Sequence, residues 1–141
     1  MIETVIYNLI STDATLLTLL GGTATDTKIY PIRSPQGKGY PYIDYNVSGY
    51  GDIAEYLHSE RITFKIVSKT YNTAASIRDR LRILLDMEYG HIKKTFTSVS
   101  YRIEYSRLVS GQDMEDEVIS EDNEDSVKII VQIYEFKFLD R

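Results

Sequence analysis

The sequence contains no cysteine and no tryptophan, only three prolines and two histidines, and no long uninterrupted apolar run. Without cysteine there is no disulfide, no thiolate metal site and no cysteine nucleophile, and the lack of disulfides favours synthesis inside a cell. The most apolar stretch is the N-terminus, but Glu3, Asn8 and Asp13 interrupt it and no basic segment precedes it. We therefore expect a soluble, unprocessed chain with no membrane span.

The length and composition are those of an ordinary globular domain. The chain has 141 residues, of which 43% are hydrophobic and 26% are charged. This is enough apolar material for one core and too short a chain for two, so we expect residues 1–141 to form a single domain.

Motifs of catalysis and cofactor binding are missing as well. His58 and His91 lie far apart in the sequence, and neither accompanies a nucleophile motif. The sequence has no P-loop, no Gly-x-Ser-x-Gly and no His-Glu-x-x-His, and Gly49-Tyr50-Gly51 is typical of a turn rather than a dinucleotide site. The sequence predicts neither an enzyme nor a cofactor.

Negative charge is concentrated in one segment, residues 113–125. It holds eight of the 21 acidic residues and no Lys or Arg, so the remaining 13 acids face 16 basic residues and give +3 elsewhere. The segment lacks the glycine and the offsets of a calcium-binding loop, so we predict no metal there. A solvated loop or hairpin is the expected structure, formed around Asp113, Glu115, Asp116, Glu117, Glu121, Asp122, Glu124 and Asp125.

Hydrophobic periodicity predicts the class α+β, with a mainly antiparallel sheet of about four strands and two helices packed on it. Apolar residues at helical spacing indicate a helix over residues 2–10, followed by turns that begin at Asp13 and end at Gly21-Gly22. A second helix is expected from Asn72 or Thr73 to a stop at Gly90. Alternating patterns predict strands over residues 40–48, 61–66, 98–109 and 127–138.

The last predicted strand is apolar on both faces. A strand of this kind is either covered twice within its own chain or partly covered by a neighbouring subunit. One face carries Val127, Ile129, Val131 and Ile133. We take the other face as the candidate subunit interface, formed by Ile130, Tyr134, Phe136 and Phe138.

The order of elements along the chain resembles the tail-terminator, or tail-completion, proteins of long-tailed bacteriophages. An N-terminal helix is followed by turns that begin at Asp13 and end at Gly21-Gly22. Next come Ile29-Tyr30-Pro31, a loop and a strand that starts Tyr40-Pro41-Tyr42, then the strand of residues 61–67, the helix of residues 74–85 and a closing strand that ends at Phe138. No single motif is specific; the order and spacing carry the resemblance. The acidic segment departs from that pattern.

The resemblance implies a structural virion protein, made in the host cytoplasm and located at the junction of tail and neck. Such a protein forms a homo-hexameric ring on the head-proximal end of the tail tube, ends polymerisation of the tube and mediates head–tail joining. Its partners would be the tail tube protein and a head connector or neck protein. Double-stranded DNA would pass through without specific binding, and the acidic segment would face the bore or the partner ring.

A second assignment remains open from the sequence. A head-completion or connector-adaptor protein of the neck, which docks on the portal side, would share the general features of a small ring subunit. The two assignments differ in which end of the junction the ring caps.

Overall fold

The computed structural model describes residues 2–32, 39–89, 96–97, 101–117 and 126–140. Within these ranges it has three helices and one six-stranded sheet. The helices are α1 (Ile2–Ser11), α2 (Ala14–Leu20) and α3 (Tyr71–Leu85). The strands are β1 (Ile29–Pro31), β2 (Tyr42–Asp52), β3 (Leu57–Ser68), β4 (Phe96–Thr97), β5 (Tyr101–Glu117) and β6 (Ser126–Asp140).

The α+β class is confirmed, but the counts of strands and helices differ from the prediction. The sheet order is β1-β2-β3-β6-β5-β4, with β1 parallel to β2 and every other pair antiparallel. The two unpredicted strands, β1 and β4, have three and two residues, too few to show an alternating pattern. The third helix arises because Asp13 divides the N-terminal helical segment into α1 and α2.

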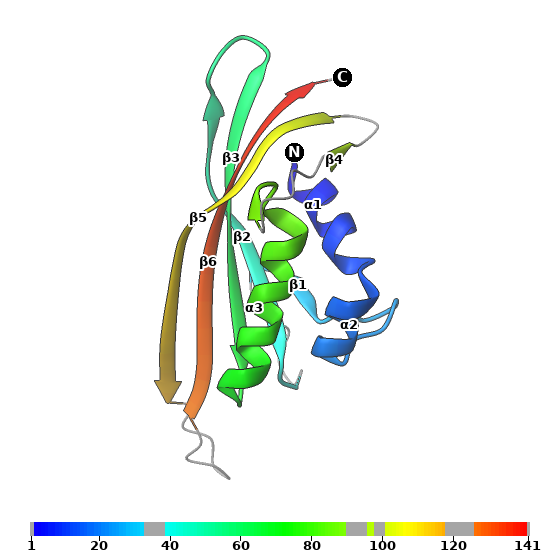
Figure 1. Ribbon diagram of the computed structural model, residues 1–141, viewed down its shortest axis with the longest axis vertical. Helices are drawn as coiled ribbons and strands as arrows, with labels where there is room; N and C mark the ends of the chain where they lie inside the picture. Colours follow the sequence, from blue (N-terminus) through cyan, green and yellow to red (C-terminus); the bar gives the residue numbers. More distant parts are fainter. Residues whose placement is uncertain (1, 33–38, 90–95, 98–100, 118–125, 141) are drawn as a thin grey trace.

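All three helices lie on one side of the sheet (Figure 1). Their buried side chains and the facing side chains of β3 and β6 form the main hydrophobic core. From α1 the core receives Ile2, Ile6 and Ile10, whose spacing of four residues places them on one helical stripe. From α3 it receives Ala74, Ile77, Leu81 and Leu85.

The boundaries of α2 follow the capping residues that the sequence indicates. The Asp13 carboxylate accepts a hydrogen bond from the Leu16 amide at 2.9 Å, as expected of an N-cap. Gly21 ends the helix in the left-handed conformation at φ +67°, which a residue with a Cβ adopts only with strain.

Asp13 also joins α2 to α3, because the Arg80 guanidinium donates to both of its carboxylate oxygens at 2.9 and 2.7 Å. The hydrogen bond from Arg80 is the main cause that holds the pKa of Asp13 below its usual range. A depressed carboxyl pKa contributes stability above the unfolded-state value of 3.8, and this contribution is lost as the pH falls through the folded-state pKa.

We expect Asp13→Ala to lower the free energy of unfolding by about 1–2 kcal/mol at pH 7, because it removes an N-cap and the anchor of Arg80. Asp13→Asn keeps a cap acceptor without the charge and should cost less. Urea unfolding at pH 7 and at pH 3 measures both variants. The deficit of Asp13→Ala should shrink at the lower pH, and a deficit of equal size at both pH values would contradict this role of the charge.

Both predicted ends of α3 require correction. The helix starts at Tyr71 with Thr70 at the cap position, so neither Asn72 nor Thr73 is the N-cap. It ends at Leu85, five residues before the predicted stop at Gly90, which lies outside the described residues. The early end has a physical cause, because Asp86 leaves the helix to join a buried polar network with β5.

The strand β6 is central and pairs with β3 on one side and with β5 on the other. Its even-numbered residues face the helices, since Ile130, Tyr134 and Phe136 all belong to the core. Its odd-numbered residues face the opposite side of the sheet, where Ile129 lies beside Val67 and Ile133 beside Thr63. No helix of the described residues lies on this side, which is called the helix-free face. The strand β5 is longer than predicted and changes register at two bulges, between Ile103 and Tyr105 and between Leu108 and Ser110.

Candidate functional site

The described residues contain no cluster that suggests catalysis or metal binding. His58 lies at the start of β3, with its Nδ1 atom 2.6 Å from an Asp52 carboxylate oxygen and its ring against Phe138. His91 lies outside the described residues. In the described part of the chain, no three His, Asp or Glu side chains are grouped as metal ligands, and no helix is long and apolar enough to cross a membrane. The features described below are surfaces of the chain.

The acidic segment begins inside the sheet. Asp113, Glu115, Asp116 and Glu117 are residues of β5, so of the expected loop or hairpin this part is a strand of the β5–β6 hairpin. Asp113 is tied to α3, because its carboxylate accepts a hydrogen bond from the Tyr71 hydroxyl at 3.0 Å and lies 4.0 Å from Arg78. The remaining acids of the segment lie outside the described residues: Glu121, Asp122, Glu124 and Asp125.

The four residues predicted as a subunit interface are core residues instead. Ile130, Tyr134, Phe136 and Phe138 have exposed fractions of 1, 0, 0 and 5%, because the helices of the same chain cover this face of β6. The face of β6 that remains for a partner is therefore the helix-free face. The pattern predicted two apolar faces of β6 correctly, but periodicity alone does not indicate which face the chain covers by itself.

The helix-free face combines apolar and basic side chains. At one end, Val67, Val127 and Ile129 form a small buried cluster beneath Tyr40 and Tyr42. Beyond this cluster Val131 and Ile133 are half-buried in the middle of the face. On β3, at the position directly after it, and on β6, the cations of this face are Arg61, Lys65, Lys69 and Lys137. Its described carboxylates on β2, β3 and β6 are Asp44, which is buried, and Glu135.

Glu135 forms ion pairs with two of these cations. Its carboxylate is 2.9 Å from the Arg61 guanidinium and 3.6 Å from the Lys137 ammonium, and Lys137 also lies over the Tyr105 ring. One carboxylate shared by two cations leaves the middle of the helix-free face with a positive balance. Such a surface suits a partner that is apolar and acidic.

The β2–β3 hairpin, residues 49–57, extends past the helices at one end of the sheet (Figure 1). Its tip is closed by a hydrogen bond from the Ile53 amide to the Leu57 carbonyl at 2.8 Å. Tyr50, Ile53 and Tyr56 are 77, 53 and 67% exposed, so the hairpin presents three large apolar side chains to solvent. The sequence indicated only a turn here, although Tyr50, Ile53 and Tyr56 place three large apolar residues within seven positions.

A hollow of about 450 Å³ lies at the base of this hairpin, between the end of β2 and the side chains of Tyr101 and Phe138. Glu60 lines it and is almost fully buried, with one carboxylate oxygen 3.4 Å from the Ile2 amide at the start of α1. Burial raises the pKa of Glu60, while the hydrogen bond from Ile2 acts in the opposite direction. Glu60 thus serves as an acceptor for the first turn of α1.

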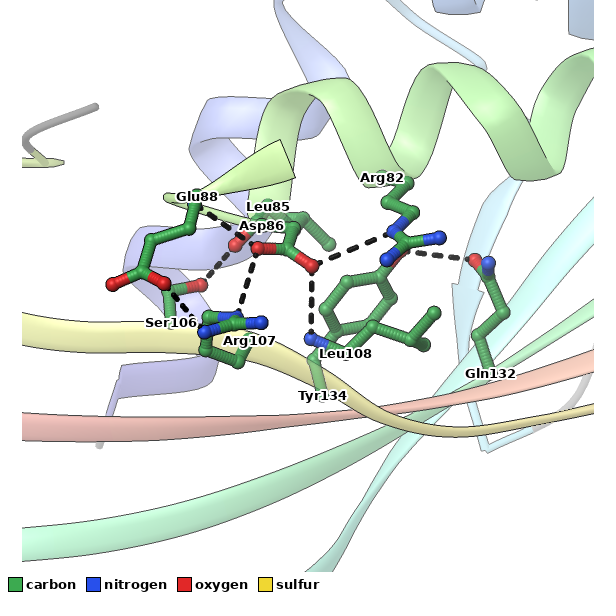
Figure 2. A network of polar contacts seen from close by, with 9 residues as sticks. All are labelled: Arg82, Leu85, Asp86, Glu88, Ser106, Arg107, Leu108, Gln132 and Tyr134. Carbon is green, nitrogen blue, oxygen red and sulfur yellow. Dashed lines mark hydrogen bonds and ion pairs between the residues drawn. The ribbon is translucent and has the colours of Figure 1, made fainter. Parts of the chain in front are cut away.

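A polar network centred on Asp86 fixes the outer side of β5 to the end of α3 (Figure 2). Asp86 is 1% exposed and lies 3.5 Å from Arg82 and 3.2 Å from Arg107. It also accepts a hydrogen bond from the Glu88 amide at 3.1 Å, and the Met87 amide donates to the Ser106 carbonyl at 2.9 Å. The segment after α3 therefore occupies backbone groups at the free edge of β5, which would otherwise be open to another strand.

Comparison with solved structures gives a match over nearly the whole chain. The fold is similar to that of a chain in the "Virion of native gene transfer agent (GTA) particle", with a TM-score of 0.62. The similarity covers 95% of this chain and 91% of that chain, at 11% sequence identity. No protein-family model matches the sequence, and no curated protein matches it. The shared property of the two chains is thus the fold.

Proposed function

We propose that this chain is a structural virion protein that forms a hexameric ring at the head-proximal end of a phage tail tube. There it ends polymerisation of the tube and mediates joining of the tail to the head connector. The observation that carries the proposal is the similarity in fold, over nearly all of both chains, to a chain in the virion of a gene transfer agent particle. The order of sequence elements, which resembles that of tail terminators, supports the finer assignment.

The surfaces of the chain are compatible with a ring. A ring of identical subunits needs two different, mutually complementary surfaces on each subunit, and the angle between them must close the assembly. The chain presents two different surfaces: the β2–β3 hairpin at one end of the sheet, and the helix-free face on the side opposite the helices. In this proposal the chain carries out no reaction and works through its contacts with the tail tube protein, the neck protein and its own copies.

The acidic segment, residues 113–125, would face the bore or the partner ring. Its eight acids would be repeated in each subunit, and such a collar would repel the DNA backbone over roughly one Debye length, about 8 Å at physiological salt. If it faces the neighbouring ring instead, complementary charge would speed docking and set its register.

Deleting the gene and imaging particles by electron microscopy tests the proposal. We expect tails of irregular length that fail to join heads, because nothing caps the growing tube. Tails of normal length that only fail to attach would contradict the terminator role and favour the head-side adaptor. A complementing copy with Asn and Gln in place of the eight acids should restore tail length but join heads or deliver DNA poorly. Normal infection by that copy would reduce the segment to a solubilising role.

A further inference from the structure

The β2–β3 hairpin and the helix-free face are opposite in charge and alike in apolar character. The hairpin, residues 49–57, contains Asp52 and Glu55 and no Lys or Arg. Its exposed apolar side chains are Tyr50, Ile53 and Tyr56. Tyrosines at an exposed tip are typical of protein interfaces, because a large ring is buried while its hydroxyl keeps a polar partner.

The described part of the chain leaves these side chains exposed. Ile53 and Tyr56 lie at the tip, beyond the last paired residues of β2 and β3, and Figure 1 shows that the helices end well short of it. Asp52 is also 71% exposed, although it pairs with His58. The tip is therefore an apolar and acidic projection without a cover among the described residues.

The helix-free face has the complementary properties. Val131 and Ile133 are half-buried there, and Lys65 and Arg61 flank them on the neighbouring strand, where Lys65 is in register with Val131. On β2, on β3 with the adjoining Lys69, and on β6, four cations of this face stand against two carboxylates, and one of these carboxylates is buried. An apolar strip bordered by cations is a suitable surface for an apolar tip bordered by acids.

We propose that the β2–β3 hairpin of one subunit docks on the helix-free face of a second copy of this chain. The two surfaces differ, so the contact is head-to-tail: each subunit gives its hairpin to one neighbour and receives the hairpin of the other. Contacts of this type generate closed rings when the rotation between subunits allows it. The inference rests on the proposed ring and adds to it the identity of the two contacting surfaces.

Thiol cross-linking tests the contact directly, because the natural chain has no cysteine. Ile53→Cys places a thiol on the hairpin, and Thr63→Cys places one in the middle of the helix-free face, in register with Ile133. A bis-maleimide with a flexible spacer is added to the assembled protein, and the products are separated on a denaturing gel. Each single-cysteine variant can give dimers at most, whereas the double variant can give a ladder that ends at the closed ring.

We expect the ladder from Ile53→Cys/Thr63→Cys and not from the control Ile53→Cys/Ser76→Cys, in which the second thiol is on an exposed position of α3. We also expect Ile53→Lys to reduce the population of rings while leaving the circular dichroism spectrum unchanged.

The two proposals fail in different ways. Rings of normal mass without the Ile53–Thr63 ladder, or with full assembly of Ile53→Lys, would overturn the hairpin contact while leaving the terminator role standing. A ladder from a protein that does not affect tail length would support the contact and count against the terminator role.

Discussion

Replacing Phe136 with aspartate should abolish folding. Phe136 is fully buried on the helix side of β6, in register with Glu60 on β3 and Ser106 on β5, and its ring lies 6.5 Å from that of Tyr134. A carboxylate at this position would be buried without a partner, which costs several kcal/mol in addition to the lost apolar contacts. Since a domain of this kind is stable by only about 5–15 kcal/mol, the folded state should not survive.

Alanine substitutions compare the two faces of β6 in a protein that still folds. Phe136→Ala should lower the free energy of unfolding by about 3–5 kcal/mol. Ile133→Ala, three residues away on the half-buried helix-free face, should cost less than about 1.5 kcal/mol. Urea unfolding compares the two. Equal losses of stability would contradict the assignment of the two faces of β6. A Phe136→Asp variant that folds stably but fails to assemble would show that Phe136 lies at a subunit interface.

Replacing Asp86 with alanine should give the second large effect on stability, a loss of about 2–3 kcal/mol. The substitution leaves two guanidinium groups, those of Arg82 and Arg107, without their buried partner and removes an acceptor for the Glu88 amide. Both arginines are more than a third exposed and regain some hydration, so the loss should remain below that of a fully buried pair. Thermal or urea unfolding measures the change.

Asp79→Ala is a matched control on the same helix. Asp79 is 59% exposed and pairs with its neighbour Arg78 at 3.0 Å, so its removal should cost less than about 0.5 kcal/mol. Because the residues after α3 occupy the edge of β5, Asp86→Ala should also speed hydrogen exchange of the Ser106 to Leu108 amides. A variant as stable as wild type with unchanged exchange would show that this network does not hold β5.

The fold could be predicted where the pattern of residues is local. The spacing of Ile2, Ile6 and Ile10 indicated α1, and Asp13 and Gly21 marked the ends of α2, because capping depends on residues a few positions apart. The short strands β1 and β4 were missed, since they are defined by their pairing with β2 and β5 rather than by their own sequence.

The candidate surfaces depended on information that periodicity does not contain. The alternation in β6 predicted two apolar faces, but which of them meets the helices is decided by tertiary packing of residues such as Leu81 and Ile62. Nothing in the sequence pattern indicated that Asp86 is buried, because its partner Arg107 is 21 positions away on β5. The hairpin at Tyr50 was predicted only as a turn, since a turn signal does not say how far the strands beside it extend.

The length of tubes assembled in vitro tests the proposal that this chain ends growth of a tail tube. The tail tube protein is allowed to polymerise with increasing amounts of the purified chain, and tube lengths are measured by electron microscopy. We expect growth to stop earlier as more chain is added, and a ring of this protein to be visible at one end of each tube. An unchanged length distribution, with no density at either end, would contradict the proposal.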